Sequence, residues 1–146
     1  MSSNERTSHL KGCRILIVDD NPTNLKLVCQ VLEYEDCEIV TAPDAEAAQE
    51  VVKSQPPDLI LMDIALPGMD GLTLTRILKS DARTRHIAIV ALTAFAMKGD
   101  DLKAREAGCD GYITKPIDTR TLAGQVAECL HKRNSHDRGV TEEFEA

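Results

Sequence analysis

The chain has 146 residues, enough for one domain with a hydrophobic core. Its formal net charge of −7 argues against nonspecific binding to nucleic acid. Its apolar runs are far shorter than the roughly 20 residues that a membrane-spanning helix needs. Tryptophan is absent and aromatic residues make up only 3%, so the core must be aliphatic.

The cysteines, histidines and chain ends show no pattern typical of a disulfide framework, a metal site or a signal peptide. Five cysteines are odd in number, scattered and without a CxxC spacing, which favours reduced, buried thiols over disulfides or a metal site. The four histidines show no ligand spacing, and no apolar signal-peptide core follows Met1. We therefore expect a cytoplasmic protein with a flexible leader at 1–12, a domain at 13–131 and a flexible tail at 132–146.

Short apolar runs and segments of helical periodicity alternate along the chain. In chain order we expect a strand at Arg14–Val18, a helix at Pro22–Leu32, a strand at Glu38–Thr41, a helix at Pro43–Lys53, a strand at Asp58–Met62, a helix at Leu72–Leu78, a strand at Ile87–Leu92, a helix at Asp100–Ala107, a strand at Tyr112–Thr114 and a helix at Asp118–His131. Five such strand–helix units, joined by right-handed crossovers, predict an α/β fold. The expected sheet is open, parallel, five-stranded and doubly wound, with helices on both faces.

Polar residues stand where four of these strands end. Asp19 and Asp20 follow the first strand, Asp63 the third, Thr93 the fourth and Lys115 the fifth. The carboxyl ends of parallel strands meet at one edge, so these side chains are expected to converge there. Clustered carboxylates favour a hard divalent cation such as Mg²⁺. With an ammonium and a hydroxyl beside it, the cluster could hold a phosphoryl group and offer it a carboxylate nucleophile.

Each of these residues also has a simpler explanation. Adjacent acids before a helix commonly cap it, and an aspartate after a strand commonly forms a turn. A threonine that ends a strand is ordinary composition, and a lysine before proline is ordinarily a solvated charge. Taken together, however, the simple explanations require polar residues at the same end of four strands by coincidence. The joint interpretation as one site is therefore preferred.

Four motifs resemble the receiver domain of two-component response regulators: VDDNPTN, LILMDIALPGMDG, VALTA and GYITKPID. They occur in the family's order and at family-like spacing over about Cys13 to Leu130. The stretch TAFAMKGDDLKAREAGCDGYITKP also resembles the receivers of single-domain chemotaxis and cell-cycle regulators and of hybrid sensor kinases. The resemblance implies a flavodoxin-like fold with strand order 2-1-3-4-5.

The resemblance also implies roles for the acidic residues. The counterpart of Asp63 in that family accepts a phosphoryl group from a histidine kinase or a histidine phosphotransfer protein. Asp20 is then expected to ligate Mg²⁺ (or Mn²⁺) directly and Asp19 through water. Asp63 and the backbone carbonyl of Ala65 would supply further oxygen ligands.

The remaining motif residues would form the phosphoryl clamp and the switch. Lys115 and Thr93 are expected to contact the phosphoryl oxygens, and the Lys115–Pro116 peptide bond is expected to be cis. Thr93 would move inward on phosphorylation, and Tyr112 would fill the space that it leaves. A partly buried core tyrosine is the competing interpretation of Tyr112.

Two positions depart from the polar residues that many relatives carry beside the phosphorylated aspartate. Ala65 lies two residues after Asp63, and Phe95 lies two residues after Thr93. Neither side chain can orient an attacking water by a hydrogen bond. The sequence therefore suggests a comparatively long-lived phosphoaspartate.

The preferred interpretation is a stand-alone receiver, a phosphorelay switch whose output is contact with a downstream effector protein. Such a protein catalyses only its own phosphorylation and dephosphorylation, binds no nucleic acid or membrane, and is a monomer or weak dimer. Three alternatives stay open: a Mg²⁺-dependent phosphohydrolase with an aspartate nucleophile, a flavin mononucleotide-binding module, and a receiver fragment of a hybrid histidine kinase. The phosphohydrolase would need a second acid where this chain has Ala65.

Overall fold

The fold is a five-stranded parallel sheet in the order β2-β1-β3-β4-β5, as expected. The computed structural model describes residues 10–93, 100–115 and 117–130. Its elements are β1 (Arg14–Val18), α2 (Pro22–Glu33), β2 (Glu38–Ala42), α3 (Ala45–Ser54), β3 (Leu59–Asp63), α4 (Gly71–Ser80), β4 (Ala88–Thr93), α5 (Asp100–Ala107) and β5 (Gly111–Thr114). Residues 122–130 form a last helical segment.

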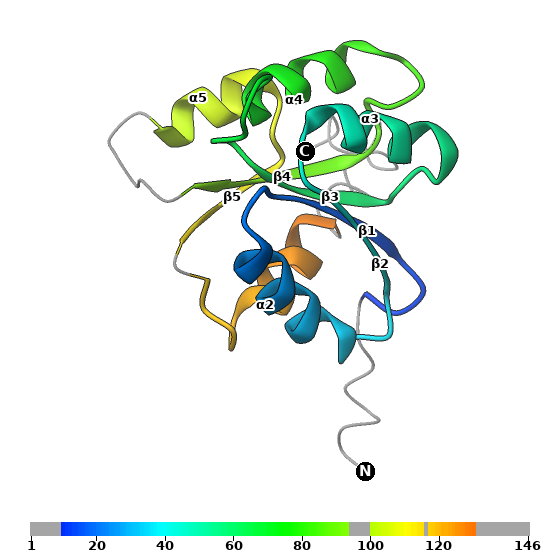
Figure 1. Ribbon diagram of the computed structural model, residues 1–146, viewed down its shortest axis with the longest axis vertical. Coiled ribbons are helices and arrows are strands. Elements are labelled where there is room, and N and C mark those ends of the chain that lie inside the picture. Colours follow the sequence, from blue (N-terminus) through cyan, green and yellow to red (C-terminus); the bar gives the residue numbers. More distant parts are fainter. Residues whose placement is uncertain (1–9, 94–99, 116, 131–146) are drawn as a thin grey trace, which may run out of the picture.

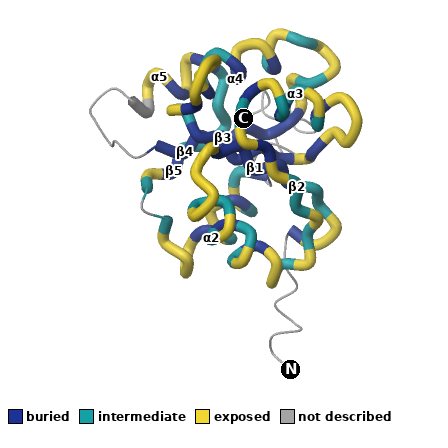
Figure 2. The backbone as a smooth tube through the Cα atoms, viewed as in Figure 1, coloured by how far each residue is buried: buried dark blue, intermediate teal, exposed yellow. Residues whose placement is uncertain are grey.

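Helices cover both faces of the sheet (Figure 1). Helices α3, α4 and α5 lie on one face, and α2 and the helical residues 122–130 lie on the other. The central strands are buried between these two layers (Figure 2). The predicted doubly wound, flavodoxin-like arrangement is therefore confirmed.

Alternation along the strands builds one core on each face. Ile15 and Ile17 of β1 point into an α2-side core, whereas Leu16 and Val18 point into an α3-side core. The α2-side core is completed by Leu10, Val28, Leu32, Leu59, Leu61, Ala88, Val90, Leu92, Ile113, Leu122, Val126 and Leu130. The α3-side core is completed by Ala42, Ala45, Ala48, Val52, Ile60, Met62, Leu66, Leu74, Leu78, Ile87 and Ile89. Both cores are aliphatic, as the composition predicted.

Helix starts are set by capping side chains. Asn21 caps α2, because its side chain accepts the N–H groups of Thr23 and Asn24, and Pro22 lies in the first turn. The prediction that Pro43 opens the next helix was wrong by two residues, because the Asp44 side chain accepts the N–H of Ala47 at 2.8 Å and caps α3. Asp70 caps α4 in the same way, so this helix begins at Gly71 rather than Leu72.

The last helical segment begins later than expected. The side chain of Asp118 accepts the N–H of Arg120 at 2.9 Å, and its carbonyl accepts the N–H of Leu122 at 3.0 Å. Residues 118–121 therefore form a turn, and the segment runs over 122–130. Gly108 follows α5 with φ +109, the left-handed conformation expected for a residue that ends a helix.

Some expectations fall outside the described residues. These are most of the leader at 1–12, Phe95, the Lys115–Pro116 peptide bond, His131 and the tail at 132–146. In the part of the chain that the structure covers, no helix is long and apolar enough to cross a membrane.

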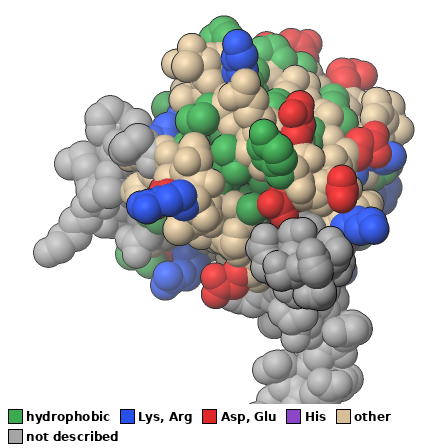
Figure 3. All heavy atoms as spheres, turned by 90° about the horizontal axis from the view of Figure 1, so that it is seen from below, with side chains coloured by type: hydrophobic (Ala, Val, Ile, Leu, Met, Phe, Trp, Pro, Cys, Tyr) green, Lys and Arg blue, Asp and Glu red, His purple; other side chains and the backbone are tan. Residues whose placement is uncertain are grey.

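Seen from the side of α2, charged side chains of both signs surround a group of hydrophobic ones (Figure 3).

Candidate phosphoacceptor site

The sheet brings the predicted polar residues to one edge. Asp63 is the last residue of β3 and Thr93 the last of β4, while Asp19 and Lys115 directly follow β1 and β5. Backbone pairing continues past two strand ends: the Asp19 N–H donates to the Ala42 carbonyl at 3.1 Å, and the Lys115 N–H donates to the Thr93 carbonyl at 2.7 Å. These backbone hydrogen bonds therefore fix the positions of the Asp19 and Lys115 backbones, from which the two side chains extend.

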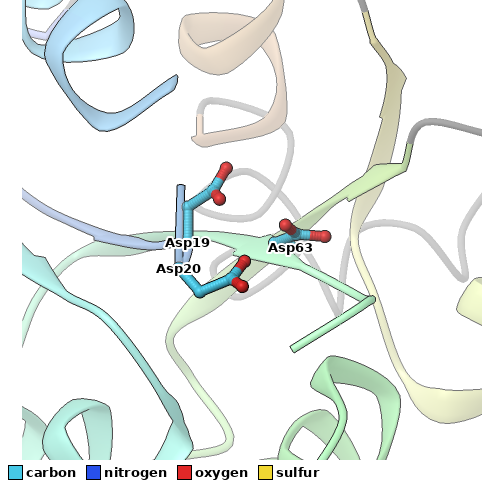
Figure 4. A group of neighbouring side chains, drawn as sticks. All are labelled: Asp19, Asp20 and Asp63. Carbon is cyan, nitrogen blue, oxygen red and sulfur yellow. The ribbon is translucent and has the colours of Figure 1, made fainter. Parts of the chain in front are cut away.

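Three carboxylates form a cluster at this edge (Figure 4). Oxygen atoms of Asp19, Asp20 and Asp63 all lie within 4.8 Å of one another. Asp19 is 1% exposed and Asp63 5%, whereas Asp20 is exposed. Two of the carboxylates are thus withdrawn from water, and the third faces it.

The ammonium group of Lys115 bridges the two buried carboxylates. Its Nζ lies 3.2 Å from Oδ2 of Asp19 and 3.1 Å from Oδ2 of Asp63. The lysine side chain is 15% exposed. The final strand thus supplies one positive charge to the acids at the ends of β1 and β3.

Backbone N–H groups bind the other oxygen of each buried acid. The Asn21 N–H donates to Oδ1 of Asp19 at 2.9 Å, and the Ala65 N–H donates to Oδ1 of Asp63 at 2.9 Å. These two donors were not predicted from the sequence, because a backbone N–H has no residue-type signature. Both bonds span two residues from an aspartate, a known turn preference that could have indicated them.

The pKa values of Asp19 and Lys115 are both raised above their ordinary values. Burial raises the pKa of Asp19 above its ordinary value, and the charge of Asp63 adds to this, whereas the Asn21 N–H and Lys115 act in the opposite direction. Burial lowers the pKa of Lys115, but the hydrogen bond and charge of Asp63, and then those of Asp19, outweigh burial and raise it overall. Lys115 is therefore held as a cation, while Asp19 bears a net cost for its own charge.

Helix α4 begins directly against the end of β3. A Cβ atom at Gly71 would overlap the carbonyl oxygen of Asp63 and lie 2.8 Å from Cα of Ile64. The Gly71 N–H also donates to the Ile64 carbonyl at 3.2 Å. Glycine is thus required here by close backbone approach, and it fixes the segment that follows Asp63.

Thr93 and Tyr112 lie on adjacent strands. Thr93 is 2% exposed and pairs with Thr114, while Tyr112 is half-buried and pairs with Ala91. Paired positions of parallel strands share a face, so Thr93 and Tyr112 point to the same side of the sheet. This is the placement that the switch prediction requires, and the switch itself stays a prediction.

The donor set fits a hard divalent cation. Carboxylate oxygens are the ligands that Mg²⁺ prefers, and an exposed acid leaves room for the waters that this ion keeps. Three carboxylates stand against the one ammonium group of Lys115, so this ammonium does not balance the charge of the cluster. A divalent ion would complete the charge balance, with Asp19, Asp20 and Asp63 as the residues placed to hold it.

Comparison with known proteins agrees with this geometry. Residues 15–127 match the family model of the response regulator receiver domain. The polar-differentiation response regulator DivK of Brucella ovis (strain ATCC 25840 / 63/290 / NCTC 10512) is 45% identical over 103 residues, which cover 70% of this chain and 84% of that protein.

Solved structures show the same similarity. A CheY-like response regulator receiver domain protein from Methanospirillum hungatei JF-1 superposes with a TM-score of 0.78 at 29% identity, covering 86% of this chain and 99% of the other. The Mn²⁺-bound form of response regulator Rcp1 superposes with a TM-score of 0.68 at 28% identity, covering 80% of this chain and 90% of the other. These matches do not favour the phosphohydrolase or the flavin mononucleotide-binding module considered from the sequence. The chain belongs to the receiver domains of two-component response regulators, which are phosphoacceptor signalling switches.

Proposed function

We propose that Asp63 is the residue that accepts the phosphoryl group. The observation that carries this proposal is the position of Lys115, whose Nζ lies 3.1 Å from Oδ2 of Asp63 and 3.2 Å from Asp19. Asp63 is the acid that ends the central strand β3, where it lies in the carboxylate cluster and pairs with this ammonium. Asp19 and Asp20 are assigned to the metal instead.

The proposed reaction is a phosphoryl transfer between two side chains. A carboxylate oxygen of Asp63 attacks the phosphorus atom of a phosphohistidine in the donor protein. The oxygen–phosphorus bond forms as the phosphorus–nitrogen bond breaks, and the bonding electron pair leaves with the imidazole nitrogen. Lys115 then pairs with the transferred group, and the Thr93 hydroxyl donates to another of its oxygens.

The metal proposal assigns roles to this chain's oxygen atoms. Asp20 and Asp63 bind the ion directly, the backbone carbonyl of Ala65 adds a ligand, and Asp19 acts mainly through water. When bound, Mg²⁺ or Mn²⁺ supplies charge neutralisation for the phosphoryl oxygens. The similar response regulator Rcp1 has been solved in a Mn²⁺-bound form, which supports this choice of ion.

The proposed output is a change of surface around β4 and β5. Phosphorylation adds about −1.5 to −2 charges and three acceptor oxygens at Asp63. Thr93 is drawn toward them, and Tyr112 takes the space that it leaves. A nearly complete switch requires a difference of about 5.5 kcal/mol between the two states, which two or three charge-assisted hydrogen bonds can supply.

The proposed partners follow from the same chemistry. A histidine kinase or histidine phosphotransfer protein donates the phosphoryl group, and a downstream effector protein binds the phosphorylated surface. We place the reaction in the cytoplasm, with the chain acting as a monomer or weak dimer and binding no nucleic acid. Its catalysis is confined to its own phosphorylation and slow dephosphorylation.

The test is intact-mass spectrometry after incubation with acetyl phosphate and Mg²⁺. We expect the wild-type chain to gain a single phosphoryl group of about 80 Da. The Asp63→Asn variant, and the wild type with a chelator, should gain none. Asp58→Asn is the matched control, because Asp58 directly precedes the same strand at its opposite end and should leave the gain unchanged.

The same spectra, followed over time, measure dephosphorylation. Ala65 is exposed and has no side-chain group that can orient a water molecule. We therefore expect the adduct to persist for minutes or longer without a partner protein. A gain that survives Asp63→Asn would refute the assignment of Asp63, and complete loss of phosphate within seconds would refute only the long lifetime.

A further inference from the structure

A groove lies between the carboxyl-terminal ends of α3 and α4, away from the acidic cluster. Its volume is about 390 Å³, within the range of roughly 300–1,000 Å³ that is typical of ligand sites. Its floor is buried and aliphatic, formed by Val52, Leu78 and Ile87. Ile87 directly precedes β4, whereas Thr93 ends it, so the groove and the phosphoacceptor site lie at opposite ends of the sheet. No residue assigned to phosphoryl transfer lines the groove.

The rim of the groove is cationic although the chain has a formal net charge of −7. Lys53 and Arg83 line the groove, and Arg76 lines a shallow depression that adjoins it at Ile77. Asp81 is the one carboxylate among these lining residues, and it pairs with Arg83 at 3.0 Å. The rim therefore has a positive surplus next to an aliphatic floor, which suits a ligand that combines negative charge with an apolar group.

The chain itself contains such a segment. Residues 141–146 read TEEFEA and place Phe144 among three glutamates, Glu142, Glu143 and Glu145. The segment has a formal charge of −3 from these glutamates, and Phe144 supplies an aromatic side chain for the floor. It is thus complementary to the groove in both charge and hydrophobicity.

The segment is long enough to reach the groove. Thirteen residues, 131–143, separate Leu130 from Phe144. Fully extended they span up to about 45 Å, roughly three times the radius of gyration of about 14 Å expected for a domain of this size. A tether of this length gives an effective concentration on the order of millimolar, so even a weak contact would be substantially populated.

We propose that residues 141–146 dock in the α3–α4 groove, with Phe144 on the aliphatic floor and the glutamates toward Lys53 and Arg83. The contact is intramolecular and independent of Asp63 phosphorylation chemistry. It covers the groove and competes with any partner protein that offers an acidic segment with an aromatic residue. The groove is thereby a second interaction surface, at the end of the sheet opposite the phosphoacceptor site.

The test is methyl NMR of the full chain with labelled isoleucine. A docked phenylalanine ring shifts nearby methyl signals, so Phe144→Ser should move the signals of Ile77 and Ile87. The signals of Ile15 and Ile17, which lie in the α2-side core, should stay in place. Val140→Ser is the matched control, because it also changes an apolar residue of the tail to serine but lies just outside the proposed segment.

A second variant tests the charge complementarity. Lys53→Glu replaces the rim cation with a negative charge and should weaken docking. In this background Phe144→Ser should shift Ile77 and Ile87 several-fold less than it does in the wild type. Adding the synthetic peptide TEEFEA at millimolar concentration to the Phe144→Ser chain should move both signals toward their wild-type positions.

Two results would overturn the proposal. Identical Ile77 and Ile87 signals in the wild type and Phe144→Ser would show that the segment does not occupy the groove. Signals that return to the Phe144→Ser positions on tenfold dilution of the wild type would show that a second copy of the chain occupies it instead.

Discussion

Asp19 shows how the site trades stability for function at the scale of a single residue. Its carboxylate is 1% exposed, and burial together with the charge of Asp63 raises its pKa. A folded-state pKa above the unfolded value means that the folded chain binds this proton more tightly. The resulting stability is fully present below the ordinary aspartate pKa and is lost as pH rises through the raised value. At neutral pH the metal-free chain therefore bears the cost of ionising Asp19.

Asp19→Asn should accordingly stabilise the metal-free protein at neutral pH. Asparagine cannot ionise, yet its Oδ1 can still accept the N–H of Asn21. We expect a rise in melting temperature of about 2–5 °C, corresponding to roughly 1 kcal/mol for a domain of this size. The rise should shrink as pH falls through the raised pKa of Asp19 and should be absent below the ordinary pKa of aspartate. Mg²⁺ should stabilise the variant less than the wild type.

The control for this prediction is Asp36→Asn. Asp36 is exposed, and its φ of 58 is a left-handed conformation that asparagine also accepts readily. The melting temperature of the Asp36→Asn variant should stay within about 1 °C of the wild-type value, as is usual for surface substitutions. If Asp19→Asn instead lowers the melting temperature without Mg²⁺, then pairing with Lys115 outweighs the burial of Asp19.

At the scale of elements, Lys79 of α4 bonds to the segments that directly precede β4 and β5. The Lys79 Nζ donates to the Ile87 carbonyl at 2.7 Å and to the Arg85 carbonyl at 3.1 Å. It also pairs with Oδ2 of Asp110 at 2.9 Å, and this same oxygen accepts the N–H of Ile89. Both charged side chains are largely buried, at 14% and 20% exposed.

Lys79→Met should destabilise the fold without touching the phosphoacceptor site. It leaves the Asp110 carboxylate poorly compensated, and we expect a loss of about 2–4 kcal/mol in the free energy of unfolding, measured in urea. The double variant Lys79→Met/Asp110→Asn should lose less than Lys79→Met alone, because no uncompensated charge remains. An equal or larger loss in the double variant would mean that the lysine acts through packing against Gly108 rather than through charge.

The elements also show what could be predicted from the sequence. Strand positions followed from apolar runs and βα alternation, and strand order from the resemblance to receiver domains. The meeting of Asp19, Asp63 and Lys115 followed from parallel strands sharing an edge. Helix starts were less certain wherever two capping signals compete, as Pro43 and Asp44 do. The Lys79–Asp110 pair and the α3–α4 groove depend on the relative placement of distant segments, for which the residue pattern has no local signal.

At the scale of the whole molecule, the sheet belongs to both cores at once. Neighbouring residues of β3 alternate between them, so Leu61 lies in the α2-side core and Met62 in the α3-side core, both fully buried. The same central strands thus contribute buried side chains to both cores. Neither helical layer can separate from the sheet without exposing apolar residues of the central strands. We therefore expect the described domain to unfold as one cooperative unit.

Leu61→Ala and Met62→Ala test this cooperativity from opposite faces. Each removes a fully buried side chain and should lower the free energy of unfolding by about 2–5 kcal/mol, whereas Tyr34→Ala, at an 86% exposed position, should change it by less than about 0.5 kcal/mol. In urea, both core variants should keep a single transition with the wild-type slope, and far-UV circular dichroism and tyrosine fluorescence should report the same midpoint. If one variant splits the transition, the face that it weakens unfolds by itself. The phosphoacceptor site, assembled from the ends of β1, β3, β4 and β5, would then depend on one layer of helices more than on the other.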